Sequence, residues 1–156
     1  MGKMKIIEFD PEYAQEIYDF VMDIKVNDLG WKKDAFELHD IKNNYLSRNG
    51  NFWIALEADK IIGTLALKDM GNNQGYLKRM YIDQEYRGKG LAQAMINILL
   101  KYAKEKRFEE IYLATTRNPV SERAIAFYKK YNFESMSKLP DNFTDDDDNV
   151  FMRLKI

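Results

Sequence analysis

The sequence predicts a mixed α/β domain with a mostly antiparallel, twisted sheet, one central splayed parallel strand pair and helices on both faces. Two observations carry this prediction. Apolar residues recur with a period of two over residues 51–82, interrupted by turn signals, which indicates an antiparallel meander. A glycine-rich turn, an amphipathic helical stripe and a short apolar run come next. This succession of strand, helix and strand predicts a right-handed crossover between parallel strands.

Length and composition indicate one domain over residues 1–156 and exclude several kinds of function. The 156 residues are 46% hydrophobic, which is ample for one core. A net charge of -1 argues against a nucleic-acid partner, which normally requires a basic excess. The chain has no cysteine, so thiolate metal sites are excluded, and we expect no metal. No apolar run approaches the roughly 20 residues of a membrane span; we expect a cytoplasmic protein without a membrane partner.

The first third of the chain predicts one strand and two helices. Residues 5–9 are apolar enough for a strand, and the Asp-Pro-Glu sequence at 10–12 supplies an N-cap, a first-turn proline and an acidic first turn. Residues 34–37 match a capping box for a second helix that ends near residue 49. The apolar stripes that we expect inward are Tyr13, Ile17, Phe20, Val21 and Ile24 in the first helix, and Leu38, Ile41 and Tyr45 in the second.

Residues 51–82 predict three strands joined by two turns. Alternation from residue 52 to residue 56 indicates the first strand, and turn residues at 58–60 lead into the second, over residues 61–68. A second turn signal at 71–73 precedes residues 76–82. The third strand should therefore pair antiparallel with the second.

The remainder of the chain predicts helix, strand, helix and two strands. The first helix carries the stripe Leu91, Met95, Ile98, Leu99 and Tyr102. The apolar run 111–115 should lie parallel to residues 76–82. A helix over residues 121–131 carries Ala124, Phe127, Tyr128 and Tyr131, and Asn132 follows where a left-handed C-cap belongs. Residues 133–137 and 150–154 are the last two strands.

The segment from Arg87 to Ala92, between a strand and the long helix, predicts an anion-binding site. Gly88 and Gly90 allow a sharp backbone turn, so that several peptide N–H groups converge at the first turn of the helix. Arg87 and Lys89 add positive charge beside it. A diphosphate would therefore be held mainly by backbone, with two cations assisting.

Spacing separates three phosphate-binding motifs that resemble this segment. No Gly-x-x-x-x-Gly-Lys-Ser/Thr sequence occurs in the chain. A dinucleotide fingerprint would need Gly or Ala where Gln93 stands, and an acidic residue where Thr115 stands. The remaining pattern, Arg/Gln-x-x-Gly-x-Gly/Ala, is met by Arg87, Gly90 and Ala92. It resembles the acyl-CoA loop of the GNAT N-acetyltransferase superfamily.

This resemblance covers nearly the whole chain, because the element order and two further segments agree with the family. They are residues 77–82, and Asn118 together with residues 124–133. The resemblance implies acetyl-CoA as cosubstrate and direct acetyl transfer in a ternary complex. The residues that it assigns to acetyl-CoA binding are Met80, Tyr81, Ile82, Arg87, Gly88, Lys89, Gly90, Leu91, Ala92, Asn118 and Phe127.

Tyr128 matches the family's tyrosine that usually protonates the leaving CoA thiolate. A phenol is neutral at pH 7 and can donate a proton. Its place on the apolar stripe of its helix, taken alone, favours core packing. With the resemblance we interpret Tyr128 as the catalytic general acid.

The amine acceptor is not legible from the sequence. Titratable candidates for a base are Glu37, His39, Glu57, Asp83 and Glu85, and each fits a solvated or capping position as well. Trp31 and Phe36 fit either the wall of an acceptor pocket or the core. The acidic run 145–148 fits a solvated loop or a surface that attracts a cationic acceptor.

We therefore expect an acetyl-CoA-dependent N-acetyltransferase that acts on a primary amine of a small molecule or peptide, with a homodimer as one option for its assembly. Two alternatives stay open. A non-catalytic module that senses acyl-CoA is suggested by the absence of an obvious base. A nucleotide-binding protein is the other alternative.

Overall fold

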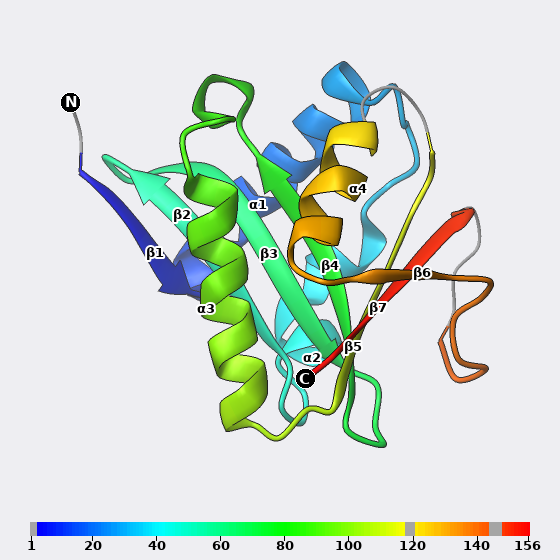
Figure 1. Cartoon of the computed structure of the whole chain (residues 1–156). Coiled ribbons are helices and arrows are strands. Elements are labelled where there is room, and N and C mark those ends of the chain that lie inside the picture. Colours follow the sequence, from blue (N-terminus) through cyan, green and yellow to red (C-terminus); the bar gives the residue numbers. More distant parts are fainter. Residues whose placement is uncertain (1–2, 118–120, 144–147) are drawn as a thin grey trace.

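The computed structural model describes residues 3–117, 121–143 and 148–156. In these ranges the strands form one sheet in the order β1-β2-β3-β4-β5-β7-β6. Neighbouring strands are antiparallel except for β4 and β5, which are parallel, so the predicted mixed sheet is confirmed (Figure 1). The strands are β1 Met4–Glu8, β2 Asn51–Glu57, β3 Lys60–Asp69, β4 Gln74–Ile82, β5 Glu110–Thr115, β6 Glu134–Met136 and β7 Val150–Lys155.

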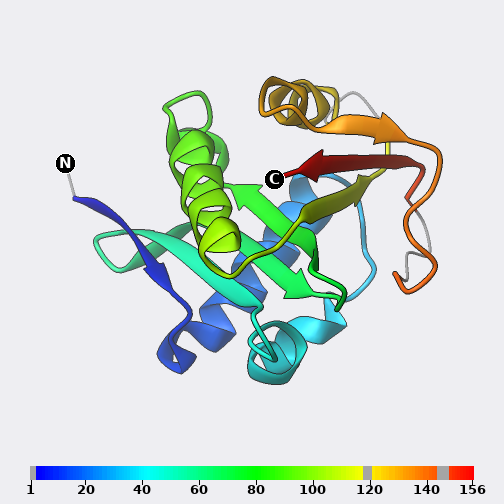
Figure 2. The same cartoon turned by 60° about the horizontal axis from the view of Figure 1, so that its bottom comes forward.

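Helices cover both faces of the sheet. Figure 2 shows α3 and α4 on one face and α1 and α2 on the other. The α-helices are α1 Ala14–Asp23, α2 Ile41–Tyr45, α3 Leu91–Glu105 and α4 Ser121–Lys130. Short 3-10 segments at Pro11–Tyr13 and Phe36–Asp40 precede α1 and α2, and a π-helical segment, Ile24–Asp28, extends α1. A third 3-10 turn, Gln84–Tyr86, follows β4.

The predicted N-cap before the first helix is confirmed, whereas the predicted capping box before the second is wrong. The Asp10 carboxylate accepts a hydrogen bond from the backbone N–H of Glu12 at 2.9 Å. Asp34 instead accepts from the Tyr18 hydroxyl. The cap of α2 is Asp40, and that helix ends at Tyr45 rather than near residue 49. The predicted inward residues of this segment are buried all the same, namely Leu38, Ile41 and Tyr45.

The sheet separates two hydrophobic clusters. The cluster under α1 and α2 includes Ile17, Val21 and Leu38, as the helical stripes predict. The cluster under α3 and α4 includes Met95 and Leu99. In α3 one residue of the predicted stripe was wrong, because Ile98 is 36% exposed and Ile96 is buried instead. In α4, Ile125 rather than Ala124 is the buried partner of Tyr128, and Asn132 has the expected left-handed conformation with φ 71°.

β4 contains a bulge that reorients its second half. The register with β3 shifts between Thr64 and Ala66, and Arg79 takes a φ of 54°, which is unusual for a residue other than glycine. The Thr64 hydroxyl donates to the Arg79 carbonyl at 2.8 Å and holds the bulge from the neighbouring strand. After the bulge, the side chains of residues 80–82 alternate between the two faces of the sheet. Met80 and Ile82 join the cluster under α3, and Tyr81 joins the cluster under α1.

The parallel strands separate soon after they meet. Their register positions are Gln74 with Glu110, Gly75 with Ile111, and Tyr76 with Tyr112. Among the described residues no pairing between β4 and β5 continues beyond Tyr76, although β4 runs to Ile82 and β5 to Thr115. This edge of β4 therefore lies between the two helical layers without a strand partner, as the predicted splay requires.

Removal of the Thr64 hydroxyl tests the anchoring of the bulge. Thr64 is 0% exposed. We expect Thr64→Val to lower the free energy of unfolding by about 1 to 2 kcal/mol, because the Arg79 carbonyl loses its donor. Urea denaturation measures this loss, and Thr64→Ser, which keeps the hydroxyl, is the control. A valine variant at least as stable as the serine variant would contradict the anchoring role.

Candidate functional site

The loop before α3 has the backbone conformation that an anion site needs. Gly88 and Gly90 have φ of 76° and 85°, and no heavy atom lies within 4 Å of where a Cβ would stand at either residue. Glycine is thus required here by conformation rather than by crowding. Gly90 is the N-cap of α3 and makes no side-chain cap, and the first turn contains no acidic residue. The N–H groups of Leu91, Ala92 and Gln93 therefore lack an intrahelical partner.

The two cations of this loop already have partners. Arg87 donates from Nε to the Ile82 carbonyl at 3.0 Å and from Nη2 to Asp28 at 2.8 Å. Asp28 ends the π-helical extension of α1, so this ion pair joins the loop to the opposite helical layer. Lys89 lies over the ring of Tyr86, with Nζ 5.6 Å from the centroid. The expected charges are present, and the Arg87 guanidinium is also a structural clamp.

Five of the eleven residues predicted to bind acetyl-CoA, together with Tyr128, lie in or against the hydrophobic cluster under α3 and α4, whereas Tyr81 lies in the cluster on the other face. Ile82, Leu91 and Tyr128 belong to one buried cluster. Met80, Ala92 and Phe127 pack against it. These residues come from the end of β4, the start of α3 and the middle of α4. Asn118, the remaining predicted contact from another segment, lies outside the described residues.

Tyr128 lies in an apolar environment beside the divergence of β4 and β5. It is 7% exposed, and its ring packs edge-on against Phe127 and Phe133 at centroid distances of 5.6 Å. Burial raises the pKa of the Tyr128 phenol above its usual value, and the phenol of Tyr81 adds to that shift. Tyr81 packs on the other face of the sheet. The two phenols therefore interact electrostatically from opposite faces of the sheet.

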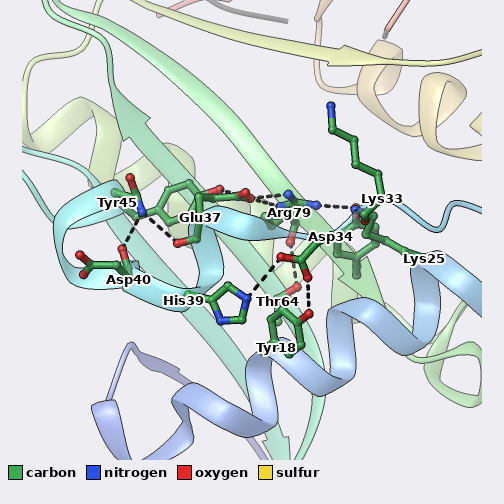
Figure 3. A network of polar contacts seen from close by, with 12 residues as sticks. Tyr18, Lys25, Lys33, Asp34, Glu37, His39, Asp40, Tyr45, Thr64 and Arg79 are labelled. Atoms are coloured by element: carbon green, nitrogen blue, oxygen red, sulfur yellow. Dashed lines mark hydrogen bonds and ion pairs between the residues drawn. The ribbon is translucent and has the colours of Figure 1, made fainter. Parts of the chain in front are cut away.

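A cluster of polar side chains lies on the face of the sheet that α1 and α2 cover, next to the second half of β4 (Figure 3). The Arg79 guanidinium donates to Glu37 from Nε at 2.5 Å and also from Nη2, and its Nη1 lies 3.4 Å from the Tyr81 hydroxyl. Tyr45 donates to the same Glu37 oxygen at 3.0 Å. Burial, the largest single effect, would raise the pKa of Glu37, but the Arg79 charge, hydrogen bonds to the carboxylate and the Lys78 charge together lower that pKa. Glu37 is thus an ionised partner of Arg79 rather than a free base.

Lys25 is a second buried cation in this cluster. It is 6% exposed, and its Nζ donates to the Lys33 carbonyl at 2.5 Å. The Lys25 carbonyl accepts a hydrogen bond from the backbone N–H of Trp31 at 2.7 Å. Lys25 is thus hydrogen-bonded to two residues of the loop after α1, Trp31 and Lys33. Burial lowers the pKa of Lys25, and repulsion from Arg79 lowers it further.

The other acceptor-side candidates have local partners. His39 contacts Asp34 at 3.3 Å and its ring lies 4.5 Å from that of Tyr18. The remaining carboxylates of the set serve local structure or face solvent: Glu57 accepts from Tyr86 at 2.5 Å, Asp83 accepts from the Glu85 backbone N–H at 2.9 Å, and Glu85 is exposed. Phe36 is 78% exposed and so is not a core residue, and Trp31 is half-buried. Residues 145–147 of the acidic run lie outside the described residues.

Sequence reasoning missed Arg79 and Lys25. The detectable signal was a charged residue inside an otherwise apolar pattern. Arg79 interrupts the strand 76–82, and Lys25 directly follows the inward residue Ile24. Both patterns are common on solvated surfaces, and only the bulge in β4 and the π-helical end of α1 turn these side chains inward.

The described residues give two further findings about partners. None of the helices in this part of the chain has the length and apolarity to span a membrane. The same ranges contain no group of three or more His, Cys, Asp or Glu side chains that could hold a metal ion.

The chain is similar in sequence to known acetyltransferases. The model of the family described as "Acetyltransferase (GNAT) family" matches residues 14–133. N-acetyltransferase family 8 member 2 of Rattus norvegicus is 29% identical over 103 residues, which are 63% of this chain and 45% of that protein. The chain spans about half the length of the curated relatives it matches.

Solved structures share the whole fold. The crystal structure of an acetyltransferase of the GNAT family from Staphylococcus aureus Mu50 is 30% identical and has a TM-score of 0.91, covering 98% of this chain and 99% of that chain. The PaiA N-acetyltransferase of Thermoplasma acidophilum, solved in complex with coenzyme A, is 20% identical with a TM-score of 0.72 and covers 99% of both chains. The predicted fold class is confirmed by this agreement.

The raised pKa of Tyr128 predicts a loss of stability in alkali. An unfolded phenol ionises near pH 10, whereas the folded Tyr128 ionises only at higher pH. The unfolded state therefore releases protons first, and the free energy of unfolding falls as the pH rises above about 10. Unfolding free energies measured across this range should fall less steeply for Tyr128→Phe than for the unaltered chain. Equal pH dependence of the two proteins would show that Tyr128 ionises normally in the folded state.

Proposed function

Because the chain belongs to the acetyltransferase (GNAT) family, we propose that it transfers the acetyl group of acetyl-CoA to a primary amine of a small molecule or peptide. The observation that carries this proposal is the convergence of three distant segments. The end of β4, the first turn of α3, which follows the glycine loop, and the tyrosine of α4 contribute to one cluster. Proteins of this family take the acetyl group from acetyl-CoA, so acetyl-CoA is the expected cosubstrate.

The residues present fit acetyl-CoA. The uncapped N-terminus of α3, with open space above two left-handed glycines, suits the diphosphate. Residues 87–92 would hold it, mainly through backbone N–H groups, with Lys89 nearby. The free edge of β4 suits an extended pantetheine arm, which would pair with the backbone at Met80 and Ile82. Phe127 would lie beside that arm.

Within this arrangement the side chain of Tyr128 would supply the proton that leaves with the product thiol. A neutral amine would attack the thioester carbonyl carbon, so that a C–N bond forms and the C–S bond breaks. The sulfur would take a proton from the Tyr128 phenol, and the proton that the new amide nitrogen loses would pass through water to restore that phenol. The raised pKa of Tyr128 keeps the phenol protonated until that moment. Backbone N–H groups at residues 80–82 would stabilise the negative charge that develops on the thioester oxygen.

The acceptor amine must lose a proton before it attacks. A lysine-like amine with a pKa near 10.4 is neutral in only about one molecule in 2500 at pH 7, a handicap of about 4.6 kcal/mol. Glu37 is engaged by Arg79 and Tyr45, so it does not serve as a free base. We propose direct transfer in a ternary complex, in which water carries this proton to solvent.

A non-catalytic module that binds acyl-CoA is the second candidate. The pairing of Glu37 favours it, because the polar cluster then offers no unengaged carboxylate. Thiol release with a panel of amines separates the two candidates. Release with any amine supports the enzyme, and saturable acetyl-CoA binding without release supports the binding module. Failure to bind acetyl-CoA in calorimetry would contradict both.

Tyr128→Phe tests the general acid. We expect turnover to fall by about 10²- to 10⁴-fold, the usual contribution of a positioned acid, with acetyl-CoA affinity unchanged. Thiol release measures turnover, and calorimetry measures affinity. The control is Tyr131→Phe, a half-buried tyrosine at the end of the same helix. A Tyr128→Phe variant with full turnover would remove the acid role and leave Tyr128 as core packing.

Gly90→Glu tests the diphosphate site. We expect acetyl-CoA affinity to fall about tenfold or more, because a side chain at positive φ costs roughly 1–2 kcal/mol and its carboxylate repels phosphate at the helix N-terminus. Gly30→Glu is a matched control, since Gly30 also has positive φ, 70°, and open space around it. Unchanged affinity of the Gly90→Glu variant in calorimetry would place the diphosphate elsewhere.

A further inference from the structure

Two cations with little solvent exposure, Arg79 and Lys25, lie near one partly buried carboxylate, that of Glu37. The Arg79 side chain is 14% exposed and pairs with Glu37, whose side chain is 26% exposed. Lys25 is 6% exposed, and the hydrogen bond that the structure gives its ammonium goes to a neutral carbonyl, that of Lys33. Among the described residues no carboxylate lies within ion-pair distance of Lys25. Of these three charged groups, two are cations and one is a carboxylate, and Lys25 is the cation without an ion-pair partner among the described residues.

The nearest remaining acid does not compensate for Lys25. Asp34 attracts Lys25 electrostatically, but its side chain is 40% exposed and is engaged by Tyr18 and His39. An unpaired cation inside a protein is unfavourable unless hydrogen bonds and an opposite charge satisfy it. A ligand anion would supply both for Lys25, beside the Arg79 guanidinium.

The cations lie where an acceptor would approach. Arg79 directly precedes residues 80–82, which we assign to the thioester. Its guanidinium contacts the Tyr81 hydroxyl at 3.4 Å, and the Tyr81 phenol interacts electrostatically with Tyr128. Arg79 therefore contacts a residue whose phenol interacts electrostatically with the proposed proton donor. The acyl donor would occupy the opposite side of the sheet, at the start of α3 (Figure 1).

We propose that Lys25 and Arg79 bind the carboxylate of the acceptor, so that the acceptor is an amine that also carries a carboxylate, as free amino acids do. This inference rests on the proposed acetyl transfer and specifies its second substrate. A guanidinium and an ammonium that converge on one carboxylate are a strong recognition pair, because both contacts are charge-assisted hydrogen bonds.

The same charges would assist the chemistry. Positive charge close to an ammonium favours its neutral form, so an acceptor held by Lys25 and Arg79 has a lowered amine pKa. The neutral amine is the nucleophile. The cation pair would therefore reduce the protonation handicap without a carboxylate base at the site.

The test compares amino acids with their amides. An amide keeps the shape of the amino acid and removes only the negative charge. We measure kcat/KM by thiol release for each acid and amide in a panel of the common amino acids. The ratio of acid to amide is then compared between the unaltered chain and Lys25→Met. This comparison of ratios cancels the intrinsic difference in amine basicity between acid and amide.

We expect Lys25→Met to lower the acid-to-amide ratio by about tenfold or more, the effect of one charge-assisted hydrogen bond. Lys25→Arg, which keeps the charge, should retain most of the ratio. Lys32→Met, an exposed lysine of the same loop, should leave it unchanged. Thermal unfolding and acetyl-CoA affinity confirm that each variant folds. If Lys25→Met lowers kcat/KM equally for acids and amides, Lys25 only supports the loop and the proposal is wrong.

Calorimetric titration with the amino acids and their amides, in the presence of CoA, provides a readout that does not depend on turnover. Amino acids should bind to the unaltered chain and bind at least tenfold more weakly to Lys25→Met, about the strength of one charge-assisted contact. If no carboxylate-bearing amine binds, or if acids and amides bind alike, the proposal is overturned. If thiol is instead released with amides or simple amines at rates as high as with the amino acids, that result would support acetyl transfer and reject only the carboxylate site.

Discussion

The short pairing between β4 and β5 is the constraint on which the site depends. Backbone N–H and carbonyl groups require partners, and in a sheet a neighbouring strand normally supplies them. Here the parallel register ends at Tyr76, while β5 keeps β7 as its partner through Thr115. The later residues of β4 retain only β3. The fold thus creates an edge inside the sheet, between two helical layers, rather than at its border.

The bulge at Arg79 changes which face of the sheet the last residues of β4 point to. A regular strand would place residues 79 and 81 on the same face as Leu77, which is the face under α3. The extra residue lets Arg79 reach Glu37 while Tyr81 stays near the gap between the strands. A buried ion pair of this kind adds little net stability, because desolvation offsets much of the attraction. Its value lies in fixing the direction of the guanidinium.

The sequence was informative where a pattern was long or a motif was short and specific. The meander, the crossover and the loop from Arg87 to Ala92 follow from periodicity, turn residues and glycine spacing, and the fold agrees. The error at Asp34 arose because Tyr18, distant in sequence, competes for the carboxylate that a capping box would use. Lys25 and Arg79 could not be found, because irregular backbone turns them inward and periodicity assumes regular backbone.

The division of the hydrophobic interior by the sheet has a consequence for how this protein can change. The buried residues under α3 and α4 and those under α1 and α2 form separate clusters on opposite faces. Energetic effects of substitutions in well-separated clusters are nearly additive. Mutations in one compartment therefore leave the other largely intact. Such modularity allows the selectivity of one half of the molecule to diversify while the machinery of the other half is inherited unchanged.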